Sequence, residues 1–165
     1  MEAGVMAPTS YSKIQIVLHW TVAALVLFQV FAHDGIVAAW TGRMDGTLVN
    51  EPTPNAHVIA GVLIFVLVAW RLVLRLGRGV PALPADEPQA LKVVAKGTHA
   101  LFYVLLLAMP LSGAAAWFLG IEAPALAHSA ARFVLIPLLV LHVLAALAQH
   151  FWFRTDVLRR MLGLA

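Results

Sequence analysis

Long apolar stretches separated by short polar segments dominate the sequence. Four windows contain no Asp, Glu, Lys or Arg, and they cover residues 14–33, 52–70, 97–121 and 133–153. Each window is close to the ~20 residues that an α-helix needs to cross about 30 Å of hydrocarbon. The pattern therefore predicts an all-α membrane protein, a bundle of four transmembrane helices at about residues 13–33, 55–76, 95–118 and 126–153.

The composition supports a membrane location. Of the 165 residues, 62% are hydrophobic and 12% are charged, against roughly 25% charged residues in an ordinary soluble domain. Cysteine is absent, which excludes disulfides, thiolate-held iron–sulfur clusters and cysteine-based zinc sites, so any metal must be held by imidazole or oxygen. We expect a lipid bilayer as the main surroundings and no nucleic-acid partner, because the formal net charge of +3 is distributed in the way that sets membrane topology.

The basic residues predict how the bundle is oriented. One side of the four windows holds nine Lys or Arg and the other holds two; the nine are Lys13, Arg71, Arg75, Arg78, Lys92, Lys96, Arg154, Arg159 and Arg160, and the two are Arg43 and Arg132. Basic residues favour the cytoplasmic side, so we expect both termini in the cytoplasm. The first window is full length, so we interpret it as part of the mature chain and not as a cleaved signal peptide.

Two segments are expected to connect the spans outside the lipid. Residues 34–54 are predicted to form an outer loop with Asp-Gly turns at positions 34–35 and 45–46. Residues 77–89 are predicted to form a Gly/Pro-rich inner loop. We find no internal repeat and interpret residues 1–165 as a single domain.

Histidines within the apolar windows are the strongest chemical signal in the sequence. Ionisable groups are expensive inside a membrane, so each needs a polar or metallic partner. His128 and His142 are fourteen residues apart, which places them ~21 Å apart along one helix and ~40° from eclipsed, so both can face the bundle interior. We expect His19 level with His142 toward the inner surface, and His57 level with His128 toward the outer surface.

This spacing predicts two stacked pairs of imidazoles. Two neutral imidazoles that face each other across a bundle interior are the usual setting for a haem iron with two axial ligands. An alternative stays open, because His33 lies fourteen residues after His19 and could replace His57 opposite His128; His57 is favoured because it enters a helical run. A histidine-lined metal carrier without haem is disfavoured, because the predicted spans contain no carboxylate and only Met109 as a thioether.

Four segments carry a resemblance to a known family. They are YSKIQIVLHW at residues 11–20, NAHVIAGVLIFVLVAWRLVLRL at 55–76, GTHALFYVLLLAMPLSG at 97–113 and LAHSAARFVLIPLLVLHVLAALAQHFWFRTDVLRRM at 126–161. Over nearly the whole chain they resemble the bacterial cytochrome b561 family. The resemblance is most specific in Gln15-x-x-x-His19-Trp20, in the His-then-Gly of the second span and in the fourteen-residue interval of the fourth.

The resemblance implies a cytochrome with two b-type haems. In that family pattern His19 and His142 would ligate the inner haem iron, His57 and His128 the outer one, and His33 and His150 neither. Iron with both axial positions filled transfers single electrons and has no open site for oxygen. Similar four-helix members include the superoxide oxidase, which implies a superoxide:ubiquinone oxidoreductase with ubiquinone as acceptor. The alternative is an electron-transfer cytochrome b subunit between quinone and an unseen dehydrogenase or periplasmic redox partner.

Candidate substrate residues lie at both ends of the predicted bundle. Near the outer haem, Arg132 and Arg43 are candidates to attract superoxide, and Arg132 could instead bind a haem propionate. The outer segments nevertheless carry four acidic residues against these two: Asp34, Asp45, Glu51 and Glu122. At the inner end, the candidates to bind a quinone carbonyl or relay protons are His99, His150, Lys96 and Gln15.

Overall fold

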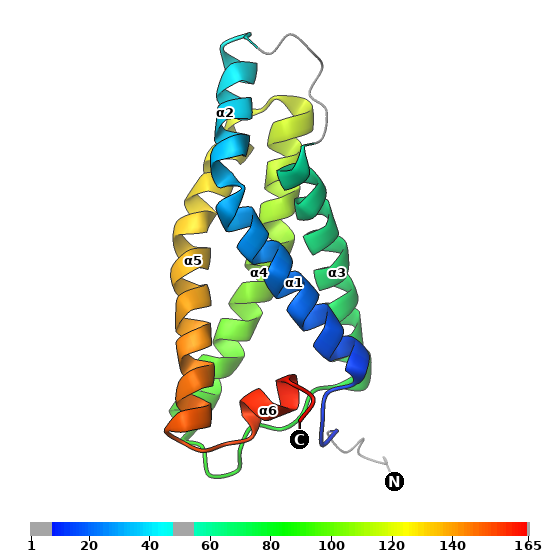
Figure 1. The fold of residues 1–165 in the computed structure, drawn as a ribbon, viewed down its shortest axis with the longest axis vertical. Coiled ribbons are helices and arrows are strands. Elements are labelled where there is room, and N and C mark those ends of the chain that lie inside the picture. The colour runs from blue at the N-terminus through cyan, green and yellow to red at the C-terminus, as the bar shows by residue number, and fades with distance from the viewer. Residues whose placement is uncertain (1–7, 48–54, 165) are drawn as a thin grey trace.

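The protein is a helical bundle in the computed structural model, which describes residues 8–47 and 55–164. The helices, in chain order, are α1 (Lys13–Phe31), α2 (His33–Met44), α3 (Ala56–Arg78), α4 (Gln89–Leu119), α5 (Glu122–Phe151) and α6 (Val157–Met161), as Figure 1 shows. Within the described residues there is no strand. Because α1, α3, α4 and α5 are long and apolar enough to cross a membrane, the predicted all-α, four-span class is confirmed.

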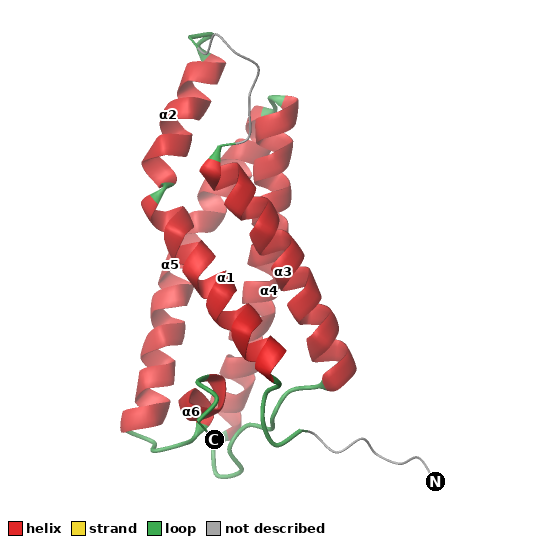
Figure 2. Ribbon diagram, turned by 45° about the vertical axis from the view of Figure 1, so that its right-hand side comes forward, coloured by secondary structure: helices red, strands yellow, loops and turns green. Residues whose placement is uncertain are grey.

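The four spanning helices run alternately up and down. α4 packs against both α3 and α5, and α1 crosses α3 obliquely (Figures 1 and 2). α1 begins and α5 ends at the same end of the bundle. We call this the inner end, following the orientation expected from the basic residues, and we call the opposite end, where α2 lies, the outer end.

The buried core is small and lies mostly between α1 and α3, with Ala116 and Trp117 of α4 also buried. Its members recur every three or four residues on one face of each helix: Gln15, Leu18, Val22 and Val26 on α1, and Ala60, Ile64 and Val68 on α3. Elsewhere large apolar side chains point outward, such as Phe31, which is 84% exposed, and Leu76, which is 78% exposed. Such a surface suits hydrocarbon, because lipid tails solvate apolar side chains as well as a protein interior does.

The segment predicted as an outer loop contains a helix. α2 begins at His33 after an interruption of one residue at Ala32. The turn expected at positions 34–35 was therefore wrong. Asp34 instead lies in the first turn of α2, where a carboxylate is stabilised by the positive end of the helix dipole.

The second predicted turn is present at the end of α2. The Asp45 carboxylate accepts hydrogen bonds from the Thr47 backbone N–H at 3.1 Å and from its hydroxyl at 2.7 Å. Gly46 has a φ of +74°, a left-handed conformation that glycine adopts without steric cost. Positions 48–54 of the predicted loop, including Glu51 in the charge count, lie outside the described residues.

Two of the spanning helices begin well outside the predicted spans. α4 starts at Gln89 instead of residue 95, and α5 starts at Glu122 instead of residue 126, while α1 ends at Phe31, two residues early. A charged residue ends the lipid-facing part of a helix but not its backbone hydrogen bonding. Gaps between charges therefore locate spans better than they locate helix ends.

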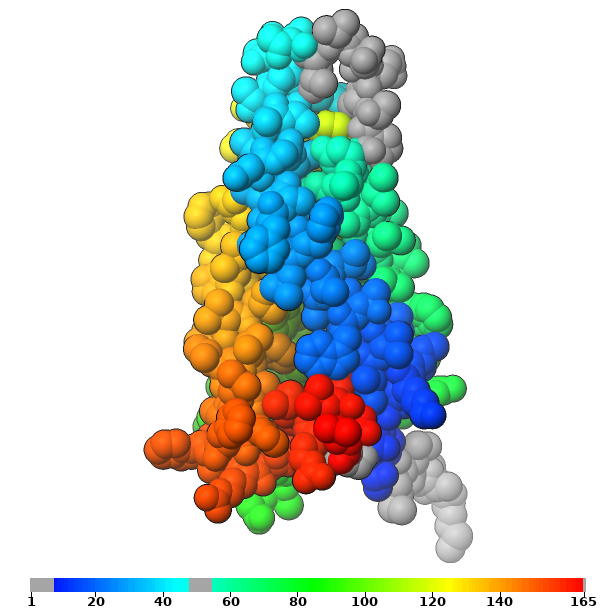
Figure 3. Space-filling model, in the orientation of Figure 1, coloured from blue at the N-terminus to red at the C-terminus, as the bar shows by residue number. Residues whose placement is uncertain are grey.

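Long-range hydrogen bonds close the inner end of the bundle. Gln15 forms a capping box with Ser12 at the start of α1, and its Nε2 donates to the Gly79 carbonyl after α3 at 3.0 Å. The Trp20 indole N–H donates to the Met161 carbonyl of α6 at 3.0 Å. Figure 3 shows α6 (red) seated between the lower parts of α1 (blue) and α5 (orange).

Replacement of Gln15 by Leu is expected to destabilise the bundle by about 1–2 kcal/mol, because it removes a helix cap and a buried hydrogen bond to the next helix. Thermal unfolding of the purified protein in detergent measures the loss. Lys13→Ala, an exposed change in the same turn, is the matched control and should stay within about 0.5 kcal/mol of the parent. Equal stability of the two variants would contradict the structural role of Gln15.

Candidate functional site: two facing histidine pairs

The outer pair consists of His57 on α3 and His128 on α5. Asn55 caps α3 by accepting a hydrogen bond from the Val58 N–H at 3.0 Å, so His57 lies in the first turn of that helix. The two ring centres are 6.1 Å apart, and the ring planes are inclined by 64°.

The inner pair consists of His19 on α1 and His142 on α5. Their ring centres are 6.3 Å apart, with the planes inclined by 61°. Since His142 follows His128 by fourteen residues on the same helix, the two pairs lie about 21 Å apart along α5. The structure therefore brings the four histidines together in the two pairs expected from their spacing.

The separations within the pairs fit one metal ion between the two rings. Two opposed metal–imidazole bonds of about 2.0–2.1 Å, with about 1.1 Å from each bound nitrogen to its ring centre, give about 6.3 Å between ring centres. The observed 6.1 Å and 6.3 Å match this value. The two rings of each pair are therefore suitably spaced to hold an ion between them.

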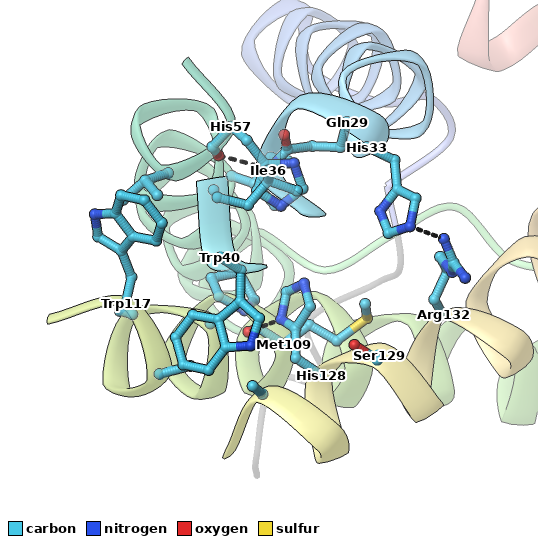
Figure 4. A pocket seen from close by; sticks show the side chains of 18 of the residues that line it. Gln29, His33, Ile36, Trp40, His57, Met109, Trp117, His128, Ser129 and Arg132 are labelled. Carbon is cyan, nitrogen blue, oxygen red and sulfur yellow. Dashed lines mark hydrogen bonds between the residues drawn. The ribbon is translucent and has the colours of Figure 1, made fainter. Parts of the chain in front are cut away.

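His128 is held in the tautomer that a ligand needs. Its Nδ1 lies 2.8 Å from the Met109 carbonyl of α4, and because a carbonyl only accepts, Nδ1 carries a proton; the neutral ring then has its lone pair on Nε2. Gly113, one turn after Met109, makes the approach possible, since a Cβ there would lie 3.0 Å from two atoms of the His128 ring. Figure 4 shows the ring with its bond to Met109.

A cavity of about 370 Å³ adjoins the outer pair. Its walls come from α1, α2, α3, α4 and α5, and most of the residues that line it are apolar, as is typical of cofactor sites. The polar and charged side chains in its walls include Gln29, His33, Arg132 and Glu122. Trp40 of α2 forms part of the wall on the outer side (Figure 4).

Aromatic rings surround the inner pair. The centre of the His99 ring lies 5.6 Å from that of His142, and the Phe102 ring lies at 5.2 Å, both from α4. Trp20 packs edge-on against His19 at 5.1 Å. His99, a candidate for the quinone site, is therefore a direct neighbour of the inner pair.

His33 is turned away from the outer pair. Its Nε2 accepts a hydrogen bond from the guanidinium of Arg132, and Figure 4 shows the ring directed toward that side chain. The alternative pairing of His33 with His128 is therefore not the arrangement in this structure. Arg132, one turn after His128, reaches the cavity wall as expected for a residue near an outer site.

Arg43 lies away from the cavity, at the end of α4. Its guanidinium donates to the Trp117 carbonyl, lies 6.0 Å from the Trp117 ring centre and approaches Gly120, the left-handed cap of α4. A cation is favourable at a helix C-terminus. Arg43 therefore anchors α2 to α4, and of the two outer arginines only Arg132 lines the cavity.

The inner candidates differ in how available they are. The polar atoms of Gln15 are already bonded within the fold, and Lys96 is exposed on α4. His150 has a buried Nδ1 without a hydrogen-bond partner among the described residues. It lines a second pocket of about 240 Å³ with Arg154, Thr155, Asp156 and Arg159.

Two residues at the outer site were missed by the sequence analysis. Gln29 of α1 donates from Nε2 to the backbone carbonyl of His57 at 2.9 Å, and Gly113 gives His128 its space. Gln29 could have been identified, because an uncharged polar side chain in a spanning helix also needs a partner. Gly113 could not, because its role depends on the packing of α4 against α5.

Two facing imidazole pairs within a four-span bundle define a membrane cytochrome. Over residues 10–164 the chain matches the family described as prokaryotic cytochrome b561, and it belongs to that family, as the resemblance implied. A cytochrome b562 of Cereibacter sphaeroides is 30% identical in an alignment covering 92% of this chain and 94% of the relative. The cytochrome b561 homolog 2 of Escherichia coli strain K12 is 27% identical, covering 94% of this chain and 93% of the relative.

Membership of this family implies electron transfer by b-type haem in a multi-pass membrane protein. The donor set fits that group, because each pair offers two imidazoles and a porphyrin supplies the remaining ligands of the iron. Within residues 8–47 and 55–164, no group of three or more His, Asp or Glu gathers as a bare metal ion would need. The residues present therefore suit haem better than a free transition metal.

Acidification is expected to loosen the start of α2. Burial and the nearby Arg132 charge lower the pKa of His33 from 6.5, against a smaller raising effect of Asp34 and with a further lowering effect of His128. Because the pKa is lower in the folded state, the His33 ring of the unfolded chain binds a proton at a higher pH than the ring in the fold does. The contact therefore stabilises α2 above about pH 6.5, and this stabilisation is lost as the pH falls below that value. Hydrogen exchange of residues 33–44, corrected for intrinsic rates, should accelerate between about pH 7.5 and about pH 5.5.

The variant His33→Asn should remove this pH dependence, because Asn does not titrate in that range. Exchange at the C-terminal end of α3, which lies at the opposite end of the bundle from α2 (Figure 1), serves as the internal control. Equal acceleration in the parent and in His33→Asn would show that another group controls the attachment of α2.

Proposed function

We propose that this chain is a di-haem superoxide:ubiquinone oxidoreductase of the bacterial inner membrane, with both termini in the cytoplasm. The observation that carries the proposal is the presence of two facing imidazole pairs, at 6.1 Å and 6.3 Å between ring centres, at the two ends of one spanning bundle. Two such sites form an electron path from one membrane face to the other.

The two pairs support the assignment of the haem ligands. His57 and His128 would hold the outer haem, and His19 and His142 would hold the inner one. A b-type haem held by two imidazoles would supply one-electron transfer. The Met109 carbonyl accepts the Nδ1–H of His128, which fixes the ring orientation and directs Nε2 to the ligand position.

Arg132 is the residue proposed to attract superoxide to the outer site. It lines the cavity beside the outer pair, and its hydrogen bond to a neutral His33 leaves its positive charge uncompensated by that partner. A cation in an apolar cavity attracts an anion more strongly than one on an open surface. The electron leaves superoxide near this arginine, and dioxygen departs as a neutral molecule.

His150 is the residue proposed to bind the quinone at the inner end. It lies two turns beyond His142 on α5, and its buried Nδ1 has no partner within the described residues. The pocket that it lines also contains Arg154 and Arg159. Two superoxide anions each give up one electron, and one ubiquinone takes up two electrons and two protons and leaves as ubiquinol. In this reaction His150 would hydrogen-bond a quinone carbonyl and pass a proton to it.

The purified protein is expected to contain two b-type haems per chain in the pyridine haemochrome assay. His57→Ala should remove one haem and His142→Ala the other, because each variant leaves one iron with a single imidazole. His33→Ala is the matched control and should retain both. Loss of a haem in His33→Ala instead of His57→Ala would reverse the pairing, and a colourless preparation carrying zinc or copper would exclude both cytochrome functions.

Oxidised protein mixed anaerobically with superoxide should show haem reduction faster than spontaneous dismutation, and added ubiquinone should reoxidise it. Arg132→Gln should slow the reduction roughly tenfold, by loss of electrostatic attraction at the cavity. Arg43→Gln removes the same charge from the outer end away from the cavity and should slow it much less. Absence of reduction by superoxide would leave the alternative, a cytochrome b subunit serving a dehydrogenase or periplasmic partner.

A further inference from the structure

Two buried polar atoms near the outer pair lack partners. Within the described residues, Gln29 Oε1 and His57 Nδ1 are both buried without a hydrogen bond. The two side chains are nevertheless neighbours, because Gln29 Nε2 donates to the backbone carbonyl of His57 at 2.9 Å (Figure 4). That bond also identifies the amide atoms: a carbonyl accepts only from the NH₂ group, so Oε1 is the free atom.

The two histidines of the outer pair differ in their support. His128 donates its Nδ1–H to the Met109 carbonyl at 2.8 Å, whereas His57 Nδ1 has no acceptor among residues 8–47 and 55–164. A histidine that binds a metal almost always donates its other ring N–H to an acceptor, which sets the ring orientation and raises the basicity of the binding nitrogen. By this rule His57 needs an acceptor on the side of its Nδ1.

Gln29 offers a free acceptor beside His57. Nδ1 is the ring nitrogen nearer the backbone, and the Gln29 amide already holds the backbone carbonyl of the same residue. Gly61, one turn after His57, leaves the amide room, since a Cβ there would lie 3.4 Å from Gln29 Nε2. The cavity wall close by is apolar, with Val26 and Ile64, so an unpaired N–H there would carry a desolvation cost.

We propose that Gln29 is a positioning residue for His57, with Oε1 accepting the Nδ1–H of the ring while Nε2 holds the His57 carbonyl. This inference rests on the proposed function, in which His57 is an axial ligand. A side chain of α1 thereby orients a ligand carried by α3, as the backbone of α4 orients the ligand carried by α5. Loss of the Gln29 acceptor makes the His57 ring a weaker donor to iron.

Potentiometric titration of the haem-loaded protein, followed optically, tests the proposal. Gln29→Leu should retain both haems and raise the midpoint potential of one, because a less basic imidazole stabilises the ferric state less. Gln29→Glu keeps an acceptor and adds negative charge, so it should lower the same potential. The haem that responds should be the one missing from His57→Ala. Ser129→Ala, which removes a hydroxyl from the same cavity wall, is the matched control and should leave both potentials unchanged.

Unchanged potentials in Gln29→Leu and Gln29→Glu would overturn the proposal, as would a shift confined to the haem that persists in His57→Ala. If Gln29→Leu loses the haem, Gln29→Glu decides: retention with a lowered potential supports the positioning role, and loss in both variants assigns Gln29 to folding alone. A parent protein without two haems would instead contradict the proposed function. The two failures are therefore distinguishable.

Discussion

Imidazole rings inside apolar helices impose the constraint on which the rest of this structure depends. A polar ring within hydrocarbon has no water to bond, so its placement is stable only where the protein or a cofactor provides a partner. Here the rings face one another across the bundle at a spacing that suits a cofactor between them: α5 contributes one member of each pair, and α1 and α3 contribute the other two. The same requirement explains why the Met109 carbonyl lies beside His128 and why a side chain is missing at Gly113.

The spanning helices could be predicted from the sequence because charged residues are excluded from hydrocarbon. Windows without charge therefore located α1, α3, α4 and α5, although they misplaced some of the helix ends. α2 could not be predicted in this way, since it lies outside the apolar windows and begins with an Asp-Gly pair that is typical of turns. It is held by tertiary contacts, from Arg132 to His33 and from Arg43 to the Trp117 carbonyl, and such contacts leave no local pattern in the sequence.

The arrangement of the histidines was predictable only up to one ambiguity. Helical periodicity placed two rings on one face of the last span, but His33 and His57 fitted the outer position equally well by spacing. His33 differs from His57 in that Arg132 of α5 donates a hydrogen bond to its ring and directs it away from His128. Arg43 was likewise expected near the outer site, but it binds the C-terminal end of α4. The sequence shows at which depth a charged side chain lies, but it does not show which partner that side chain contacts.

The position of α5 at the end of the spanning series has a consequence for biosynthesis. Each histidine pair takes one ring from this helix, so neither pair exists while the ribosome is still producing the first three spans. The inner pair closes later still, because Trp20, next to His19, is tied to the Met161 carbonyl of α6, 141 residues further along the chain. With the proposed ligands, haem loading at both depths would therefore follow insertion of all four spanning helices, because a shorter nascent chain leaves its histidines without their counterparts.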